Sequence, residues 1–278
     1  MNTTLPPQAP KTTLPAAARL GINRCNLPAV ILGSLTFQDH PEPLHIDGVK
    51  SFHGDLFQRL DALNDFSERA QQFQDYMAVT FRLDAPEDVG ATKDTARTNA
   101  DYLRLLRGWF FNTDGREGAV IKSWVESRFG LLTRHHGGPV YENNAPAMSS
   151  FLKDRAHGLH NTNALEAQLD LLYTYTQYEL SRAEPFQPYL TLYRGVNKLD
   201  GFEVLDKIER SKQVLLLNNV NSFSTDRDMA CAFGDYILTV KVPFSKIVFF
   251  SGLLPGCMKG ENEYLVLGGV YEVGVAVF

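Results

Sequence analysis

The chain ends with the stretch Tyr271-Glu272-Val273-Gly274-Val275-Ala276-Val277-Phe278, in which large apolar residues alternate with small or polar ones. A period of two places each set on its own face of a strand, so this stretch predicts a β-strand that borders a hydrophobic core. Toward the N-terminus, other short segments rich in β-branched and aromatic residues are separated by Gly, Pro and Asn, which predicts further strands. We expect strands over Tyr189–Tyr193, Val214–Leu217, Tyr236–Val242, Ile247–Phe250, Tyr264–Leu267 and Val270–Phe278.

The residues before Pro185 follow a helical period instead. Apolar residues three and four apart predict one continuous helix from Asp55 to Met77 and further helices over Ala100–Phe111 and Arg116–Phe129. Gly130 is suited to end the last of these, because glycine readily adopts the left-handed conformation of a C-cap. The pattern predicts an α+β protein, in which a mostly helical N-terminal region precedes a β-rich one.

The domain boundaries follow from local composition. Residues 1–18 are rich in Pro, Thr and Ala and predict a disordered leader. Residues 21–49 contain apolar pieces between prolines, which favours a long ordered arm. Asn163 and Glu166 have the spacing of a capping box and predict the start of another helix. We expect a mainly helical region over 19–184 and a β-rich core over 185–278, packed as one continuous globular unit.

Composition and charge exclude several classes of protein. The 278 residues are 44% hydrophobic and 21% charged, and a formal net charge of −5 disfavours a nucleic-acid partner. No apolar run approaches the length of a membrane span, and the N-terminus lacks the pattern of a signal peptide. Cys25, Cys231 and Cys257 are too few and too widely spaced for a disulfide framework. We expect an intracellular, cytoplasmic protein with reduced thiols.

The polar residues that carry chemistry lie in the β-rich region. Tyr193-Arg194-Gly195 ends a predicted strand, Asn221-Ser222-Phe223-Ser224-Thr225-Asp226 precedes a short helical turn, and Gly260-Glu261-Asn262-Glu263-Tyr264-Leu265-Val266 leads from a loop into a strand. Each fragment alone also fits a structural role. Arg194 suits a surface charge, Asp226 the N-cap of the turn, and the two glutamates a solvated loop.

In this order the fragments resemble the Arg–Ser–Glu signature of the ADP-ribosyltransferase family. Arg194 matches the arginine of that signature, Ser224 the first serine of its Ser-Thr-Ser motif, and Glu263 the catalytic glutamate. Glu261 matches the upstream glutamate that is typical of arginine-modifying members. The chain departs from the pattern at Asp226, which stands where the family has its third serine.

The segments Ile22–Pro28 and Leu35–Phe37, the helical region and the β-rich region together resemble the dinitrogenase-reductase ADP-ribosyltransferases. This resemblance implies a mixed or antiparallel β-sandwich core, NAD as the ADP-ribose donor, and no metal. It also implies that the acceptor is an arginine on the nitrogenase iron protein, whose modification switches off nitrogen fixation. A PII-type nitrogen regulatory protein is the regulatory partner that it implies.

The chemistry of ADP-ribose transfer accounts for these residue types. A carboxylate such as Glu263 stabilises the positive charge that builds on the ribose when the nicotinamide bond breaks. The guanidinium of Arg194 suits the pyrophosphate of NAD, and the hydroxyl of Ser224 suits the orientation of Glu263 or of the nicotinamide. A protonated acceptor arginine is a poor nucleophile, so Glu261 is expected to dock it and to take its proton.

Other residues near the fragments have two possible roles. The backbone at Gly195 can approach the nicotinamide closely, and Phe233 or Tyr236 can stack on the nicotinamide or fill the core. The sequence has no Gly-x-Gly-x-x-Gly after a strand, so it does not support Rossmann-type hydride transfer. His135 and His136 have no carboxylate or cysteine at useful spacing, so we interpret them as surface or helix-end histidines.

Two other functions fit the same pattern. One is a toxin-like ADP-ribosyltransferase or NAD glycohydrolase that acts on another target. The other is a catalytically inactive binding module of the same fold, which the complete Arg–Ser–Glu set disfavours.

Overall fold

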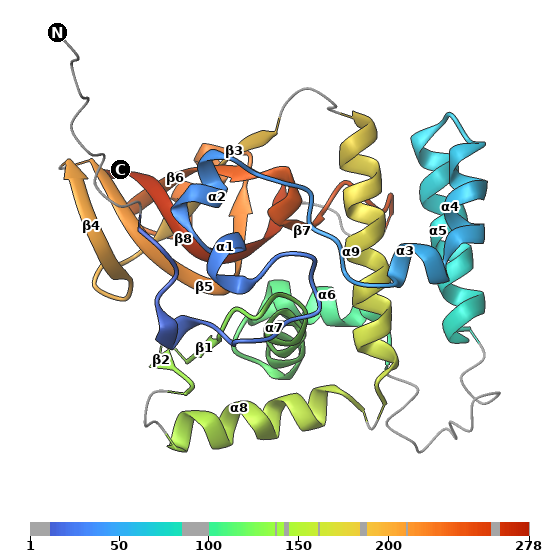
Figure 1. Cartoon of the computed structure of the whole chain (residues 1–278), viewed down its shortest axis with the longest axis horizontal. Helices are drawn as coiled ribbons and strands as arrows, with labels where there is room; N and C mark the ends of the chain where they lie inside the picture. Colours follow the sequence, from blue (N-terminus) through green and yellow to red (C-terminus); the bar gives the residue numbers. More distant parts are fainter. Residues whose placement is uncertain are drawn as a thin grey trace, which may run out of the picture.

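The structure, a computed structural model, describes residues 12–84, 100–136, 138–141, 145–160, 162–183, 188–209, 211–256 and 262–277. Helices dominate the first part of the chain and strands the last part, which confirms the predicted α+β class (Figure 1). Short helical segments come first, namely a 3-10 helix at Ala16–Ala18, α1 (Ala29–Leu32), α2 (Leu35–Asp39) and α3 (Val49–Phe52). The longer helices are α4 (Gly54–Asp61), α5 (Phe66–Phe81), α6 (Tyr102–Phe111), α7 (Arg116–Phe129), α8 (Ala145–Gly158) and α9 (Ala164–Ala183).

The strands form a small hairpin and one larger sheet. The hairpin consists of β1 (Arg134–His135) and β2 (Gly138–Pro139). The larger sheet is antiparallel, with the order β4-β5-β3-β6-β8-β7. Its strands are β3 (Tyr189–Val196), β4 (Glu203–Glu209), β5 (Lys212–Ser224), β6 (Tyr236–Pro243), β7 (Ile247–Phe250) and β8 (Glu263–Val277); α10 (Arg227–Cys231) follows β5, and a 3-10 helix (Phe244–Lys246) follows β6.

The larger sheet closes on itself. β5 pairs with β3 and also with β8, so that β5, β3, β6 and β8 form a ring of neighbouring strands. Alternate residues of β5 belong to two hydrophobic clusters. Leu215 and Leu217 pack with residues of the other strands, while Leu216 and Val220 pack with the helices. The two layers of the expected sandwich are therefore parts of one curved sheet, and both faces of β5 are buried.

The last two predicted strands are a single strand, β8, because the two glycines between them continue it. A Cβ on Gly268 would lie 1.6 Å from the carbonyl oxygen of Asn218. Gly269 adopts φ +108°, a conformation that side chains oppose, and its backbone lies against Gly33 of the N-terminal arm. The amide of Val270 donates to the Gly33 carbonyl at 2.8 Å. Gly268 and Gly269 therefore do not end the strand. They leave room for the backbone of the N-terminal arm to pack against it.

The disordered leader predicted over residues 1–18 does not extend that far. Leu14 is only 2% exposed and belongs to the largest hydrophobic cluster. The amide of Leu35 donates to the Thr12 carbonyl at 3.2 Å, which ties this segment to α2. Composition does not reveal such contacts, because they depend on partners far away in the chain. Residues 1–11 lie outside the described part of the chain.

The continuous helix predicted from Asp55 to Met77 is wrong, because the structure has two helices there. α4 ends at Asp61, and α5 begins after Asp65, whose carboxylate accepts the Glu68 amide as an N-cap. Apolar residues remain three and four apart across the break, so periodicity alone does not reveal it. An aspartate followed by a polar first turn was the local signal of a new helix start.

The other predicted helices are confirmed. α7 spans Arg116–Phe129 and ends at Gly130 with φ +71°, as expected for a left-handed C-cap. α9 begins at Ala164, next to the predicted start. α6 occupies the predicted segment, but its buried face is centred on Leu106 and Trp109, while Phe110 is only partly buried.

Several elements have no counterpart in the sequence prediction, and α8 and β4 are the longest of them. α8 lies against α7, on the side of α7 away from the sheet in Figure 1. β4 is an edge strand of sequence Glu-Val-Leu-Asp-Lys-Ile-Glu, and most of its side chains are exposed. Charged side chains are typical of edge strands, since they oppose pairing with a strand of another molecule. They also interrupt the alternation of apolar residues by which a strand is predicted from sequence.

Candidate active site

The ends of three strands meet where the sequence predicts the site. Ser224, the last residue of β5, pairs with Tyr193 of β3 and with Glu263, the first residue of β8. Directly opposed residues of antiparallel strands share a face, with Cβ atoms about 5 Å apart. The hydroxyl of Ser224 and the carboxylate of Glu263 therefore project from one side of the sheet. Arg194 follows Tyr193 on the adjoining strand, so its Cβ points to the opposite face. Its guanidinium is nevertheless close to the pair, since it binds the Ser222 carbonyl and interacts with the charge of Glu263. The structure thus brings Arg194, Ser224 and Glu263 together.

Arg194 is held by the backbone of β5. Its Nη1 donates to the Ser222 carbonyl at 2.7 Å. Burial lowers the pKa of Arg194, and the nearby Glu263 carboxylate acts in the opposite direction. An arginine remains charged at neutral pH even so. Its Nε is buried and has no hydrogen-bond partner among the described residues, so the guanidinium retains a donor for an anionic group.

Ser222 and Trp109 belong to the site although the sequence prediction did not assign them a role. The indole Nε1 of Trp109 donates to the Ser222 hydroxyl at 2.9 Å, while the Ser222 carbonyl accepts from Arg194. Trp109 is 1% exposed and comes from α6, so a helix far away in the sequence supports the arginine. Ser222 alternates with Ser224 along β5, and this alternation was the available signal. No local pattern indicated Trp109.

Asp226 has a defined role at the position of the third motif serine. Its carboxylate accepts the amides of Asp228 at 2.8 Å and Met229 at 3.1 Å, which caps α10 as predicted. The amide of Asp226 itself donates to the Ser224 hydroxyl at 3.0 Å. The departure from the family pattern therefore preserves a turn that orients Ser224.

The backbone of β3 packs closely against α10. A Cβ on Gly195 would lie 1.9 Å from the Ala230 carbonyl oxygen, and one on Gly234 would lie 2.2 Å from the carbonyl carbon of Val196. Neither position accommodates a side chain without displacement of backbone. Gly195 is therefore required for packing between β3 and α10, and this contact fixes α10 beside Arg194.

The two aromatic residues near the motifs have different environments. Phe233 follows α10 and is 63% exposed, so it does not fill the core. An exposed aromatic ring beside a polar site is suited to stack on a planar ligand. Tyr236 pairs with Val196 and with Val277 and packs partly buried against the hydrophobic cluster of the strands. Of the two, Phe233 has the accessibility that stacking requires.

Of the two predicted glutamates, Glu263 lies in the described part of the chain. The carbonyl of Glu263 accepts the Ser251 amide at 2.9 Å, which fixes the start of β8 beside the residue that follows β7. The side chain of Glu263 is half-buried. Glu261 lies outside the described residues, so its assignment remains a prediction.

A second cation lies near Arg194. Lys122 of α7 is 1% exposed, and its Nζ donates to the carboxylate of Asp114. Burial lowers the pKa of Lys122, Asp114 raises it, and the charge of Arg194 lowers it further. The backbone carbonyl of Lys122 accepts a hydrogen bond from the side-chain amide of Asn219 on β5 at 2.8 Å. The helical region thus contributes both an indole and a cation to the surroundings of the motif.

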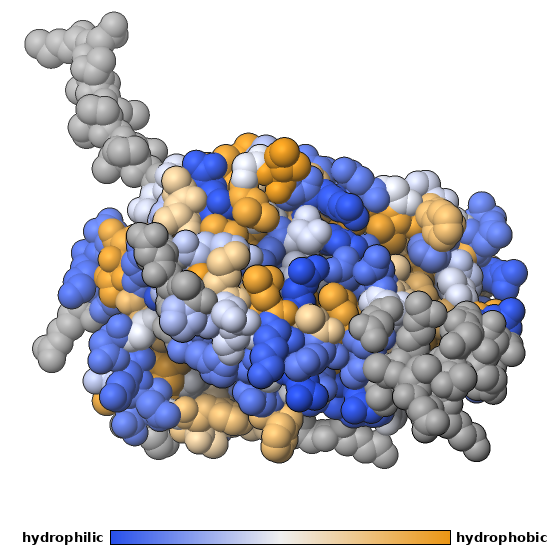
Figure 2. All heavy atoms as spheres, turned by 90° about the horizontal axis from the view of Figure 1, so that it is seen from below, coloured by the Kyte–Doolittle hydropathy of each residue, from blue (hydrophilic) through white to orange (hydrophobic). Residues whose placement is uncertain are grey.

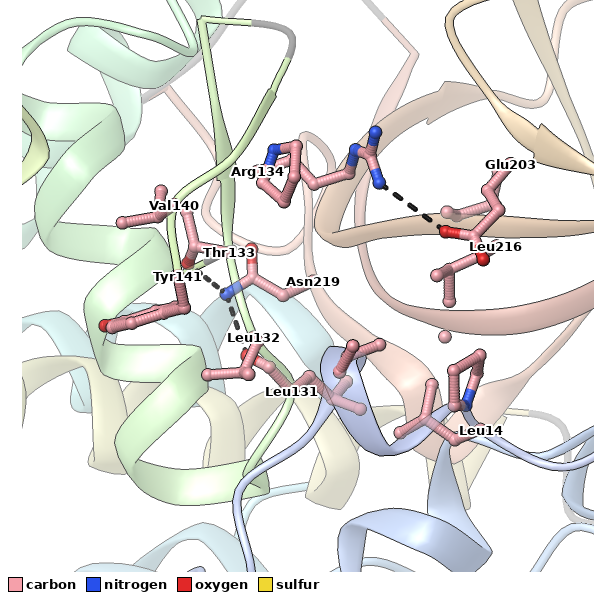
Figure 3. Close-up of a pocket in the computed structure, with 16 residues that line it drawn as sticks. Leu14, Leu131, Leu132, Thr133, Arg134, Val140, Tyr141, Glu203, Leu216 and Asn219 are labelled. Carbon is pink, nitrogen blue, oxygen red and sulfur yellow. Dashed lines mark hydrogen bonds and ion pairs between the residues drawn. The ribbon is translucent and has the colours of Figure 1, made fainter. Parts of the chain in front are cut away.

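Two cavities of the structure lie away from the motif residues. The first, shown in Figure 3, has a volume of about 40 Å³, which is close to the volume of one water molecule. In it Arg134 reaches toward Glu203 at 3.8 Å, and the amide of Asn219 donates to Thr133. The second is an open groove of about 1390 Å³ between α9 and residues 41–51. Neither is lined by Arg194, Ser224 or Glu263, so neither marks the motif site.

The described residues include two of the three cysteines and most of the helical region. Cys25 and Cys231 are free, and Cys257 lies outside the described part. Burial raises the pKa of the Cys25 thiol, which makes it unreactive at neutral pH. Among the described residues, no helix is both long and apolar enough to cross a bilayer.

Comparison with known proteins shows the family to which the chain belongs. Residues 22–275 match the family model of dinitrogenase reductase ADP-ribosyltransferase. The NAD(+)--dinitrogen-reductase ADP-D-ribosyltransferase of Rhodospirillum rubrum is 40% identical over 259 residues, which cover 90% of this chain and 93% of that protein. No solved structure shows a significant match.

Proposed function

Because the chain belongs to the dinitrogenase reductase ADP-ribosyltransferase family, we propose that it transfers ADP-ribose from NAD to an arginine of dinitrogenase reductase, the nitrogenase iron protein. The observation that supports this most directly is the convergence of Arg194, Ser224 and Glu263 at the ends of three strands. The modification releases nicotinamide and places a bulky, charged group on the acceptor, which switches off nitrogen fixation.

Glu263 stabilises the transition state in this proposal. The bond between the anomeric carbon and the nicotinamide nitrogen breaks, and its electron pair leaves with nicotinamide. The ribose becomes positively charged, and a carboxylate fixed beside it lowers the energy of that charge. The pairing of Glu263 with Ser224 at the first residue of β8 supplies the required rigidity.

Arg194 and Phe233 bind NAD in this proposal. The unpartnered, buried Nε of Arg194 is a donor for the pyrophosphate, and its charge is permanent. The exposed ring of Phe233 is a platform for nicotinamide. Ser224 accepts a backbone hydrogen bond and retains its own proton for Glu263 or for the carboxamide.

The acceptor arginine requires a second carboxylate, for which Glu261 is the candidate. A guanidinium nitrogen forms a bond to the anomeric carbon, and the proton that it loses is transferred to a base. Glu261 lies two residues before Glu263, so the sequence places it close to the first carboxylate. Because NAD and the proposed acceptor are intracellular, the proposed reaction takes place in the cytoplasm.

The decisive experiment measures nicotinamide release from NAD with and without purified iron protein, together with label transfer to that protein. Glu263→Gln is nearly isosteric and removes the charge, so we expect a loss of at least about a hundredfold in transfer with folding intact. Glu272→Gln is the matched control, since Glu272 lies on the same strand and pairs with Lys212 at the surface.

The outcomes separate the alternatives. Full activity of a folded Glu263→Gln protein would contradict the assignment of the site. Nicotinamide release without any transfer to iron protein would instead indicate an NAD glycohydrolase or a transferase with another target. Absence of both activities in the natural sequence would indicate a binding module.

We also propose that the helical region recognises the acceptor or a PII-type regulator. In all, 193 residues precede Arg194, more than NAD chemistry requires, and α6 and α7 lie beside the motif. A protein acceptor must be selected by surface, since one arginine is chosen among many. Phe111 ends α6 and is 92% exposed, which makes its ring a candidate contact.

Phe111→Ser is expected to weaken binding of the iron protein or of PII protein at least several-fold and to leave NAD binding unchanged. Phe52→Ser is the control, because Phe52 is 83% exposed on α3, a helix that packs against α9. Binding is measured separately to NAD, iron protein and PII protein. If neither protein distinguishes Phe111→Ser from the natural sequence, this end of α6 does not form the docking surface.

A further inference from the structure

The structure assembles a cluster of metal-ligand side chains outside the motif site. His135 is in β1, His136 follows it in the hairpin turn, and Asp154 is in α8. One ligand atom from each lies within 4.8 Å of the other two. The Nε2 of His135 is 3.6 Å from an Asp154 carboxylate oxygen, which is too long for a hydrogen bond. The sequence shows no carboxylate at useful spacing from the two histidines. The structure supplies one, Asp154, from helix α8, which the sequence analysis did not predict.

The environment of His135 is that of a ligand rather than of a surface residue. Its side chain is fully buried, and its Nε2 has no hydrogen-bond partner among the described residues. Its Nδ1 lies 3.4 Å from Asp114, so a carboxylate stands behind the ring on the side away from Asp154.

His136 closes the cluster from the solvent side. It adopts φ +50°, a left-handed conformation that a residue with a side chain adopts at a cost in energy. This conformation brings its ring to 4.4 Å from the ring of His135, edge to face. His136 is exposed, so an ion can reach the cluster from solvent. Figure 2, which views the molecule from the side of α8, shows a largely hydrophilic face with scattered hydrophobic groups.

We propose that His135, His136 and Asp154 bind a divalent transition-metal ion, with Zn²⁺ as the ion whose preferences they fit best. Two imidazole nitrogens and one carboxylate oxygen suit zinc, and three protein ligands leave a fourth position for water. Ligand atoms about 2.1 Å from a tetrahedral ion are about 3.4 Å apart, close to the 3.6 Å between His135 and Asp154. Asp114 lies 3.4 Å from the other ring nitrogen of His135, on the side where outer carboxylates lie in zinc sites.

The site is distinct from the proposed NAD site, although the two adjoin through Lys122. The Nζ of Lys122 is 3.4 Å from the Nδ1 of His135, and its pKa responds to the charge of Arg194. The ion would join the β1–β2 hairpin to α8, two elements that also touch through the rings of His135 and Phe151. Its direct effect is thus on the position of the hairpin and of α8.

The test is metal binding to the full chain without a histidine tag, after treatment with a chelator. Zn²⁺ is titrated in competition with a chromophoric chelator, and we expect one ion per chain. His136→Ala and Asp154→Asn each remove one ligand at an accessible position and are expected to weaken binding at least about tenfold. His40→Ala and Asp75→Asn are exposed controls of the same types, remote in sequence from the cluster, and are expected to bind as the natural sequence does.

A thermal measurement provides a second readout that is independent of NAD. Zn²⁺ is expected to raise the Tm of the natural sequence and of both controls, and to leave the Tm of His136→Ala and Asp154→Asn nearly unchanged. Mg²⁺ at the same concentration is expected to have no effect, because it prefers oxygen ligands. Equal Zn²⁺ affinity in all variants, or no stoichiometric binding to the natural sequence, would overturn the proposal and leave the proposed function untouched.

Discussion

At the scale of single residues, the proposed reaction uses two carboxylates, those of Glu263 and Glu261, for two different steps. Glu263 is proposed to face the sugar, and its backbone is fixed by the pairing with Ser224 and by the Ser251 amide, which donates to its carbonyl. Glu261 is proposed to handle the acceptor alone. If so, the two side chains affect different steps, and the steps can be measured apart.

Glu261→Gln is expected to abolish arginine modification, because the acceptor loses its base, while hydrolysis of NAD by water continues. Both activities are measured on one preparation, as labelled acceptor and as free nicotinamide. The comparison variant is Glu263→Gln, which is expected to lose both activities. Equal loss of both in Glu261→Gln would show that this residue belongs to NAD cleavage or to the structure of the loop.

At the scale of elements, α6 supports the motif strand through one indole. Trp109 of α6 donates to Ser222 of β5, and Ser222 in turn holds Arg194. Trp124 of α7 is also fully buried, but its indole donates to Asp170 of α9 at 2.6 Å. The two tryptophans therefore provide matched tests of packing and of site support.

Trp109→Phe and Trp124→Phe are each expected to lower the free energy of unfolding by about 1–3 kcal/mol, because each removes a hydrogen bond to a partly buried acceptor and opens a small void. A several-fold rise in the KM for NAD is expected of Trp109→Phe alone. Urea unfolding gives the first quantity and initial rates the second. A similar rise in KM for both variants would mean that general loosening, and not the Ser222 contact, affects the site.

At the scale of the whole molecule, Lys246 joins the N-terminal arm to the sheet. It is fully buried, its Nζ donates to the Gly268 carbonyl at 3.0 Å, and it lies over the rings of Phe37 and Tyr271. Burial lowers the pKa of Lys246 to about 7, far below the usual value for lysine. Between pH 7 and 10 the unfolded chain binds a proton here that the folded chain does not. Stability attributable to this residue therefore rises with pH across that window and is lowest below it.

Lys246→Met is expected to remove this pH dependence, because it replaces a titrating group with an apolar one of similar length. The free energy of unfolding of the natural sequence should rise by up to about 1.4 kcal/mol per pH unit more than that of the variant between pH 7 and 10. The measurement is urea unfolding of both proteins at several pH values. Parallel curves would show that Lys246 keeps its charge, stabilised by the carbonyl and the two rings.

Sequence by itself determined the local elements and the identity of the motif. Helix α7 with its end at Gly130, the strand Ile247–Phe250 and the N-cap at Asp226 each depend on residues within a few positions of one another. Such short-range preferences act in any chain that contains them. The order of Arg194, Ser224 and Glu263 likewise identified the family before any contact was known.

Tertiary structure alone decided which distant residues meet. The closure of the sheet through β5 and β8 and the order imposed on Leu14 depend on packing partners elsewhere in the chain. The same holds for Trp109 at the motif and for Asp154 beside the histidine pair. Periodicity records which face of an element is apolar, but the free energy of burial does not depend on which apolar surface covers that face. The identity of the covering surface is therefore settled only when the whole chain is packed.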